Sequence, residues 1–168
     1  AKQAVIKNNG GMIAMATGSG KSRVAVEVAK HYINSIDKSL SLLVPTEKLR
    51  DENWKEEYSK WDADYLWSPT IRLCYASASK IQNKDFELAI LDEGHNITEL
   101  SSEFFSNNKV ERTVLLTATP PSDPVKKEIL KSLGINLVYE VTLDQAVRLG
   151  FVAPYKITVV SVALDNTT

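Results

Sequence analysis

Short apolar runs alternate with longer amphipathic segments along the whole chain. The apolar runs predict buried strands at residues 11–16, 40–44, 71–75, 86–91, 113–116, 137–139 and 155–164. The amphipathic segments predict helices at residues 1–7, 21–33, 46–60, 98–107, 123–133 and 142–149. Strands that alternate with helices are typical of a mostly parallel sheet with helices on both faces, so the predicted fold class is α/β.

A glycine-rich turn, Met15-Ala-Thr-Gly-Ser-Gly-Lys-Ser22, joins the first predicted strand to the first long helix. Glycines allow positive φ, which turns backbone N–H groups inward, and the following helix adds the positive end of its dipole. A lysine can meet the outer phosphates and a serine hydroxyl can bind Mg²⁺. Although methionine stands where the usual pattern opens with glycine, the segment predicts a P-loop, with a plain Gly/Ser turn as the alternative. The expected nucleotide-binding residues are Thr17, Gly18, Ser19, Gly20, Lys21 and Ser22.

Two carboxylates, Asp92 and Glu93, directly follow the apolar run 86–91. A buried parallel strand delivers such residues to the carboxyl edge of the sheet, where ligands bind in open α/β folds. Asp92 can hold the Mg²⁺ that Ser22 faces, and Glu93 can act as a general base toward water. An acidic turn on a solvated edge is the alternative, which the P-loop upstream disfavours. Glu93, Lys21 and Asp92 are therefore the candidate catalytic residues.

Four aromatic residues, Trp54, Tyr58, Trp61 and Tyr65, recur at helical spacing. Such a ladder can stack nucleic-acid bases. Aromatic residues on one helical face more often pack in a core, and we expect that role here.

Composition limits the remaining choices. The 168 residues suffice for one domain, and the net charge of −1 gives no general basic field, so nucleic-acid binding would need a local patch. Cys74 is the only cysteine, which excludes an intramolecular disulfide. No signal peptide or long apolar span is present, which favours a cytoplasmic location without membrane contact. The chain begins without Met, and we expect it to be a fragment of a longer protein.

Four segments occur in the order of motifs I, Ia, II and III of superfamily 2 helicases and translocases, which this chain resembles over nearly its whole length. They are Ala16-Thr-Gly-Ser-Gly-Lys-Ser22, Val44-Pro-Thr46, Asp92-Glu-Gly-His95 and Leu116-Thr-Ala-Thr-Pro120. The likeness is strongest to motor subunits of restriction enzymes and to DNA repair helicases. It implies that residues 1–168 form a single RecA-like P-loop NTPase domain, the N-terminal one of two.

The resemblance also implies roles for individual residues. Lys21 and the glycine turn would hold the phosphates of ATP, Ser22 and Asp92 the Mg²⁺, and Glu93 would activate water. The residues that would couple hydrolysis to movement are His95, Thr117 and Thr119. The residues that would touch the nucleic-acid backbone are Pro45, Thr46 and Ser77. Gly94 stands where alanine is usual, and we expect it to loosen the loop.

The expected function is that of the N-terminal motor domain of an ATP-dependent helicase or translocase. The family likeness favours DNA, and RNA stays open. The expected partners are a second RecA-like domain and a possible nuclease or other effector domain. Because the second domain would supply the arginine finger, residues 1–168 alone should hydrolyse ATP slowly. The alternatives are an ATP-dependent nucleic-acid-binding clamp and a restriction-system motor subunit without unwinding activity. A small-molecule P-loop kinase is not supported, because such enzymes need a lid with arginines near the phosphates and none is evident in this sequence.

Overall fold

A six-stranded sheet forms the centre of the computed structural model, which describes residues 1–35, 38–154 and 158. The sheet order is β3-β2-β5-β7-β1-β8, and every pairing between neighbours is parallel. The strands are β1 (Gly11–Met15), β2 (Leu40–Val44), β3 (Ile71–Cys74), β5 (Leu88–Leu91), β7 (Thr113–Thr117) and β8 (Leu137–Val141). The predicted α/β class with a parallel sheet is confirmed. The predicted strand at 155–164 lies outside the described residues.

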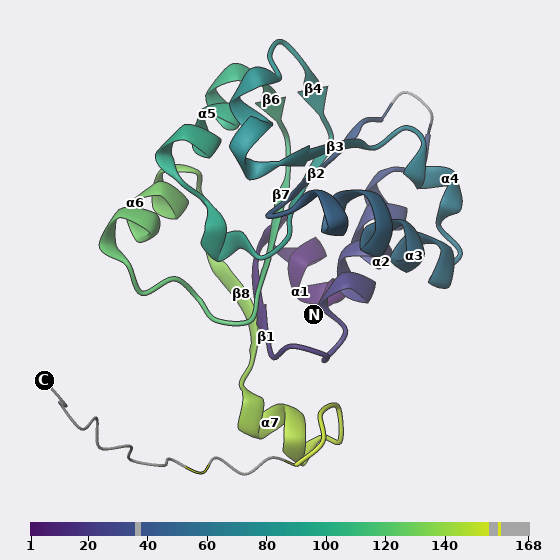
Figure 1. Ribbon diagram of the computed structural model, residues 1–168, viewed down its shortest axis with the longest axis vertical. Coiled ribbons are helices and arrows are strands. Elements are labelled where there is room, and N and C mark those ends of the chain that lie inside the picture. The colour runs from purple at the N-terminus through teal and green to yellow at the C-terminus, as the bar shows by residue number, and fades with distance from the viewer. Residues whose placement is uncertain (36–37, 155–157, 159–168) are drawn as a thin grey trace, which may run out of the picture.

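Helices cover both faces of this sheet (Figure 1). One layer contains α1 (Lys2–Lys7), α2 (Lys21–Tyr32), α3 (Trp54–Lys60) and α4 (Asp64–Trp67). The other contains the 3₁₀-helix η2 (Tyr75–Lys80), α5 (Glu99–Asn107) and α6 (Pro124–Ser132). A last helix, α7 (Leu143–Arg148), follows β8 beyond the lower end of the sheet in Figure 1.

Alternate residues of each central strand pack into the two different cores. In β2, Leu42 and Val44 join the core beneath α1 to α4, whereas Leu43 joins the core beneath α5 and α6. Successive side chains of a strand point to opposite faces, so a strand covered on both sides needs apolar residues throughout. This requirement explains the uninterrupted apolar runs that marked the strands in the sequence.

The predicted strand at 86–91 is two strands rather than one. β4 (Asp85–Phe86) pairs with β6 (Lys109–Val110) in a separate two-stranded sheet, and β5 begins only at Leu88. Between them, the Glu87 carboxylate pairs with Lys38 and with Arg112. Glu87 therefore interrupts the apolar run and lies where the chain passes from one sheet to the other.

The predicted helix at 46–60 is confirmed, since residues 47–60 are helical, but part of it is π-helical rather than α-helical. A π-helical turn, η1 (Leu49–Asn53), precedes α3, and the Thr46 hydroxyl accepts a hydrogen bond from Leu49 N at 3.3 Å. The short helix α4, which contains Leu66 in the core, was not predicted. Within the described part of the chain, no helix has both the length and the apolar character needed to cross a membrane.

The buried hydroxyl of Ser41 in β2 has no hydrogen-bond partner among the described residues. A buried, unpaired hydroxyl costs about 1–3 kcal/mol, so we expect Ser41→Ala to raise the free energy of unfolding by about 1 kcal/mol. Chemical denaturation would measure the change. The matched control is Ser101→Ala, whose equally buried hydroxyl takes part in the capping box of α5, and this variant should be less stable. Destabilisation by Ser41→Ala would contradict the expectation.

Candidate functional site

The carboxyl ends of β1, β7 and β5 lie next to one another, because these three strands are adjacent and parallel. β1 leads into the glycine-rich turn, β5 into Asp92, and β7 ends at Thr117. Three motifs that are far apart in the sequence therefore meet at one edge of the sheet, which we call the carboxyl edge. It is the lower end of the sheet in Figure 1.

The glycine-rich turn has the backbone that a phosphate cradle requires. Gly18 and Gly20 have φ of +78° and +90°, and a Cβ at either position would meet nothing within 4 Å. Glycine is needed here for conformation rather than for space. The Ser19 amide and hydroxyl both donate to the Ala16 carbonyl, at 3.1 and 2.5 Å, and close the turn. Thr17 is exposed beside it.

The N-terminus of α2 differs from those of α5, α6 and α7. Thr98, Asp123 and Thr142 cap α5, α6 and α7 by accepting a backbone N–H. No described side chain caps α2, which begins at Lys21 directly after Gly20. The first N–H groups of a helix have no partner within the helix, so those of α2 are donors that suit a phosphate.

The Lys21 ammonium is folded back over this turn. Its Nζ donates to the Met15 carbonyl at 3.0 Å, and the residue is 8% exposed. This contact also explains why methionine is tolerated at position 15. The turn uses the backbone oxygen of Met15, which any residue provides, while the residue is buried in the core beneath α2.

Asp92 is buried at the end of β5 and is held by several hydrogen bonds. Its Oδ2 accepts from the Trp54 indole N–H at 2.8 Å, and its Oδ1 from the Glu93 amide at 3.0 Å. Burial raises the pKa of Asp92, and Glu93 raises it further, whereas the Trp54 N–H, the Glu93 amide and the Lys21 ammonium lower it. Lys21 follows β1 and Asp92 follows β5, so the two charged residues lie at the same edge of the sheet with only β7 between their strands.

Glu93 adopts a left-handed backbone conformation, with φ of 47° and ψ of 53°. Such a conformation is strained for a residue with a side chain and turns the chain sharply out of the strand. The carboxylate is 30% exposed, and its Oε2 lies 3.4 Å from His95 Nδ1. Glu93 can therefore reach solvent at the carboxyl edge while Asp92 stays buried.

His95 connects Glu93 to the end of β7. Its Nδ1 lies 3.3 Å from Thr117 Oγ1. The Thr117 hydroxyl donates to the Thr119 carbonyl at 2.8 Å and accepts from the Thr119 amide at 3.2 Å. Because a hydroxyl has one hydrogen, the contact with His95 requires a hydrogen on Nδ1. The three predicted coupling residues thus form one continuous chain, in which Thr119 takes part through its backbone.

Gly94 does not loosen the loop, contrary to the expectation from sequence. A Cβ at this position would lie 2.1 Å from Leu115 Cγ, far inside van der Waals contact. Gly94 is buried against β7, and its missing side chain is what lets the turn approach the sheet. The glycine therefore tightens the packing of motif II.

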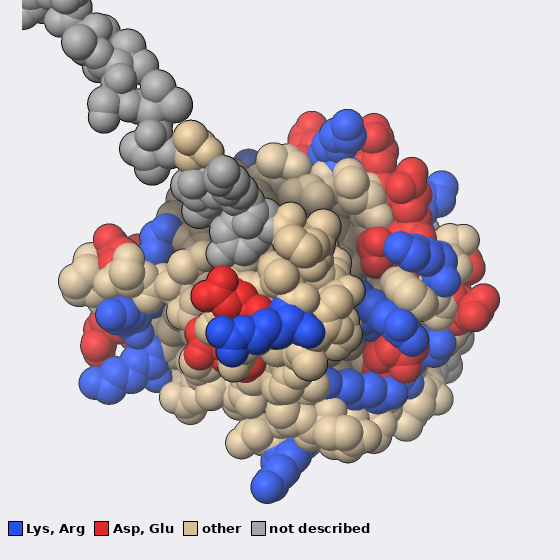
Figure 2. Space-filling view, turned by 90° about the horizontal axis from the view of Figure 1, so that it is seen from below, with Lys and Arg blue, Asp and Glu red and all other residues tan. Residues whose placement is uncertain are grey.

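The predicted nucleic-acid contacts also lie at the carboxyl edge, after β2 and β3. Pro45 is half-buried and Thr46 exposed. Ser77 is half-buried in η2, and its hydroxyl donates to the Cys74 carbonyl at 3.1 Å. Seen from below in Figure 2, this end of the molecule carries blue and red side chains intermixed rather than one basic patch.

The aromatic ladder is divided between core and surface. Trp54 and Tyr58 are 2% and 0% exposed, whereas Tyr65 is 59% exposed. The Tyr58 ring packs against the rings of Trp54 and Trp67, with centroids 6.0 and 5.8 Å away. The first half of the ladder is therefore core, as expected, and cannot stack bases.

Two residues that hold Asp92 were not predicted as part of the site. Trp54 was assigned only to packing, and Tyr75 only to a strand end. The Tyr75 hydroxyl donates to the Asp92 carbonyl at 2.9 Å, and burial raises the pKa of this phenol, which keeps its hydrogen. A buried indole or phenol needs a hydrogen-bond partner, which was the one signal available in the sequence.

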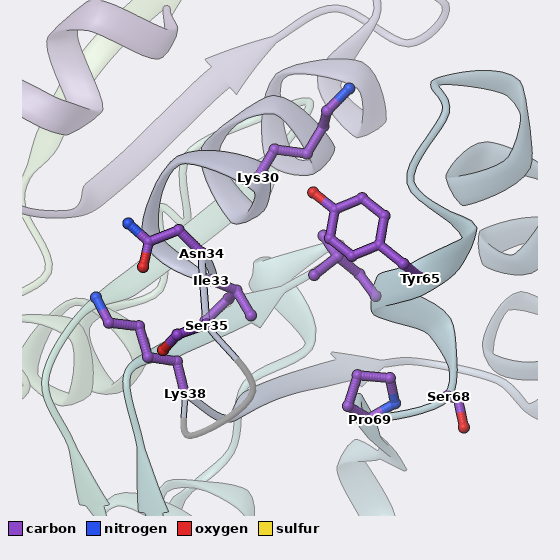
Figure 3. A pocket seen from close by; sticks show the side chains of 9 residues that line it. Lys30, Ile33, Asn34, Ser35, Lys38, Tyr65, Ser68 and Pro69 are labelled. Atoms are coloured by element: carbon purple, nitrogen blue, oxygen red, sulfur yellow. The ribbon is translucent and has the colours of Figure 1, made fainter.

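A cavity of about 670 Å³ lies at the other end of the strands, where β2 and β3 begin (Figure 3). Its apolar walls come from Ile33, Tyr65, Leu66 and Pro69. Two lysines also line it, but Lys30 Nζ donates to the Trp61 carbonyl at 3.0 Å and Lys38 Nζ lies 3.4 Å from a Glu87 carboxylate oxygen. This cavity lacks the phosphate-binding features that are gathered at the carboxyl edge.

The chain is similar to known proteins in sequence and in fold. Residues 2–72 match the family model described as "Type III restriction enzyme, res subunit". The chain is 30% identical to the DNA 3'-5' translocase XPB2 of Sulfurisphaera tokodaii over 184 residues, which cover 99% of this chain and 39% of that protein.

Two solved structures share the fold. The Hef helicase domain of Pyrococcus furiosus gives a TM-score of 0.64 at 20% identity, over 83% of this chain and 37% of that one. The second is a nuclease-deletion mutant of the Type ISP restriction-modification enzyme LlaGI in complex with a DNA substrate mimic. It gives a TM-score of 0.65 at 16% identity, over 90% of this chain and 20% of that one. The chain thus has a RecA-like helicase fold and resembles superfamily 2 helicases and translocases, and it spans less than half of each of these proteins.

We expect Gly94→Ala to lower the free energy of unfolding by about 1–3 kcal/mol, because the new methyl group overpacks the contact with Leu115. Thermal or urea unfolding of the single variant measures this cost. The control is the same substitution in a Leu115→Ala background, where the clashing atoms are absent and the added cost should shrink. An equal cost in both backgrounds would show that the clash is not its cause.

Proposed function

We propose that residues 1–168 are the N-terminal motor domain of an ATP-dependent helicase or translocase of superfamily 2 that acts on DNA. The observation that carries this proposal is that Lys21, at the N-terminus of α2 without a side-chain cap, and Asp92, at the end of β5, lie at the same edge of the sheet. Phosphate donors and a metal-binding carboxylate at one edge are what Mg-ATP requires. The likeness to a DNA translocase and to a restriction enzyme seen with a DNA mimic favours DNA as the track.

The residues present fit ATP with Mg²⁺. Gly18 to Gly20, Lys21 and the first N–H groups of α2 would hold the phosphates, with Thr17 at the exposed side. Ser22 and Asp92 would hold Mg²⁺, since hydroxyl and carboxylate oxygens suit this ion. When bound, Mg²⁺ neutralises charge on the phosphoryl group. Glu93, half-exposed beside the buried carboxylate, would orient and deprotonate the attacking water.

Movement along the nucleic acid would depend on residues that do not themselves hold the nucleotide. His95, Thr117 and Thr119 would relay the state of Glu93 to the end of β7. Pro45, Thr46 and Ser77 would contact the nucleic-acid backbone, which carries no base sequence. A second RecA-like domain of the same polypeptide would supply the arginine finger, so residues 1–168 alone would turn over slowly. A nuclease or another effector domain is a further proposed partner.

A restriction-system motor subunit that translocates without unwinding is the second candidate. The match of residues 2–72 to the restriction-enzyme family model favours it. An ATP-dependent clamp is disfavoured, because a clamp has no need of a carboxylate placed like that of Glu93.

We expect Glu93→Gln in the full-length protein to lower ATP turnover by about 10²–10⁴-fold, since the general base is lost, while nucleotide binding is kept. Steady-state ATPase and equilibrium nucleotide binding provide the two measurements. The matched control is Glu99→Gln, which removes an exposed carboxylate from the first turn of α5 and should leave turnover unchanged. Unchanged turnover in Glu93→Gln would favour the clamp.

We expect Thr117→Val to separate hydrolysis from movement, because the Thr117 hydroxyl makes the contacts with both His95 and Thr119. Coupling changes of about 0.5–2 kcal/mol correspond to a rise of about 2–30-fold in ATP consumed per distance travelled. A translocation assay run beside an ATPase assay gives this ratio. Thr119→Val keeps the backbone groups that Thr117 uses and should change the ratio less. Equal effects of the two substitutions, or none, would remove Thr117 from the relay.

A further inference from the structure

We propose that Trp54 and Tyr75 are positioning residues that hold Asp92 in place for Mg²⁺. This assignment rests on the proposed function, in which Asp92 binds the metal. Neither residue belongs to the motifs by which the chain resembles a motor domain, and each makes one hydrogen bond to Asp92 from a different element.

The Trp54 indole fixes the carboxylate itself. Trp54 is 2% exposed at the start of α3, and its N–H donates to Asp92 Oδ2 at 2.8 Å. The Glu93 amide occupies one position on Oδ1. Each carboxylate oxygen has two lone-pair sites, so the two donors set the plane of the group and still leave a site on each oxygen for a cation.

The Tyr75 phenol fixes the backbone of Asp92. Its hydroxyl donates to the Asp92 carbonyl at 2.9 Å, while the Asp92 amide donates to the Leu43 carbonyl at 2.8 Å. The residue is therefore tied on its amide side to β2 and on its carbonyl side to η2. Tyr75 is 6% exposed, so water does not compete freely for this bond.

These bonds resemble the outer-shell contacts that orient metal ligands in other proteins. Loss of such a contact costs about 10–100-fold in metal affinity or activity. A purely structural role for Trp54 would instead predict a general loss of stability and of nucleotide binding. The two roles therefore differ in whether the defect depends on Mg²⁺.

The test uses the full-length protein and a fluorescent ATPγS analogue, whose binding is measured during a Mg²⁺ titration and again in EDTA. For Trp54→Phe, we expect the half-saturating Mg²⁺ concentration to rise by about 10–100-fold. Affinity in EDTA should not change, because the P-loop donors are untouched. Tyr75→Phe should shift the Mg²⁺ dependence in the same direction and by less, since its bond is to the carbonyl.

The matched control is Trp61→Phe. Its indole N–H also donates to a carboxylate, Glu57 Oε2 at 3.0 Å, but away from Asp92, so this variant should behave like the unmodified protein. An unchanged Mg²⁺ dependence in Trp54→Phe, or an equal loss of affinity in EDTA, overturns the positioning role. If Trp54→Phe does not fold, an unchanged Mg²⁺ dependence in Tyr75→Phe overturns it. Failure of the unmodified protein to bind the analogue in a Mg²⁺-dependent way overturns the proposed function instead.

Discussion

The burial of an ammonium and a carboxylate at one edge of the sheet is the constraint on which the candidate site depends. Lys21 and Asp92 are each 8% exposed, and burying either charge alone would be costly. Local donors and acceptors offset that cost: the Met15 carbonyl for the ammonium, and the Trp54 indole and Glu93 amide for the carboxylate. The arrangement keeps both charges at the edge of the sheet, where a phosphate with its metal ion can meet them.

The parallel sheet is what brings these charges together. β7 lies between β1 and β5, so the strands that lead into the glycine-rich turn and the acidic pair are separated by a single strand, which ends at Thr117. Because the strands of this sheet are parallel, their carboxyl ends lie at the same edge, and residues from separate parts of the chain are brought together there. The apolar cores on both faces hold this alignment, which gives the polar edge a rigid support.

The sequence predicted the parallel fold and the places of the glycine-rich turn and the acidic pair at the ends of their strands, because strand, loop and helix signals are local. It could not predict the contacts of Asp92 with Trp54 and Tyr75, which join residues 38 and 17 positions apart. Aromatic periodicity reports that a side chain is buried but not where its polar atom points. The break at Glu87 was missed for a similar reason, since an apolar run does not reveal which strand it pairs with.

The close approach of Gly94 to the sheet depends on the size of the side chain opposite it, Leu115 in β7. The space above Leu115 admits a hydrogen atom but not a methyl group at position 94. A protein with alanine at this position would need a shorter side chain than leucine opposite it, or a turn set farther from the sheet. The two positions should therefore change together during evolution, and their joint variation would record how closely motif II approaches the sheet in each lineage.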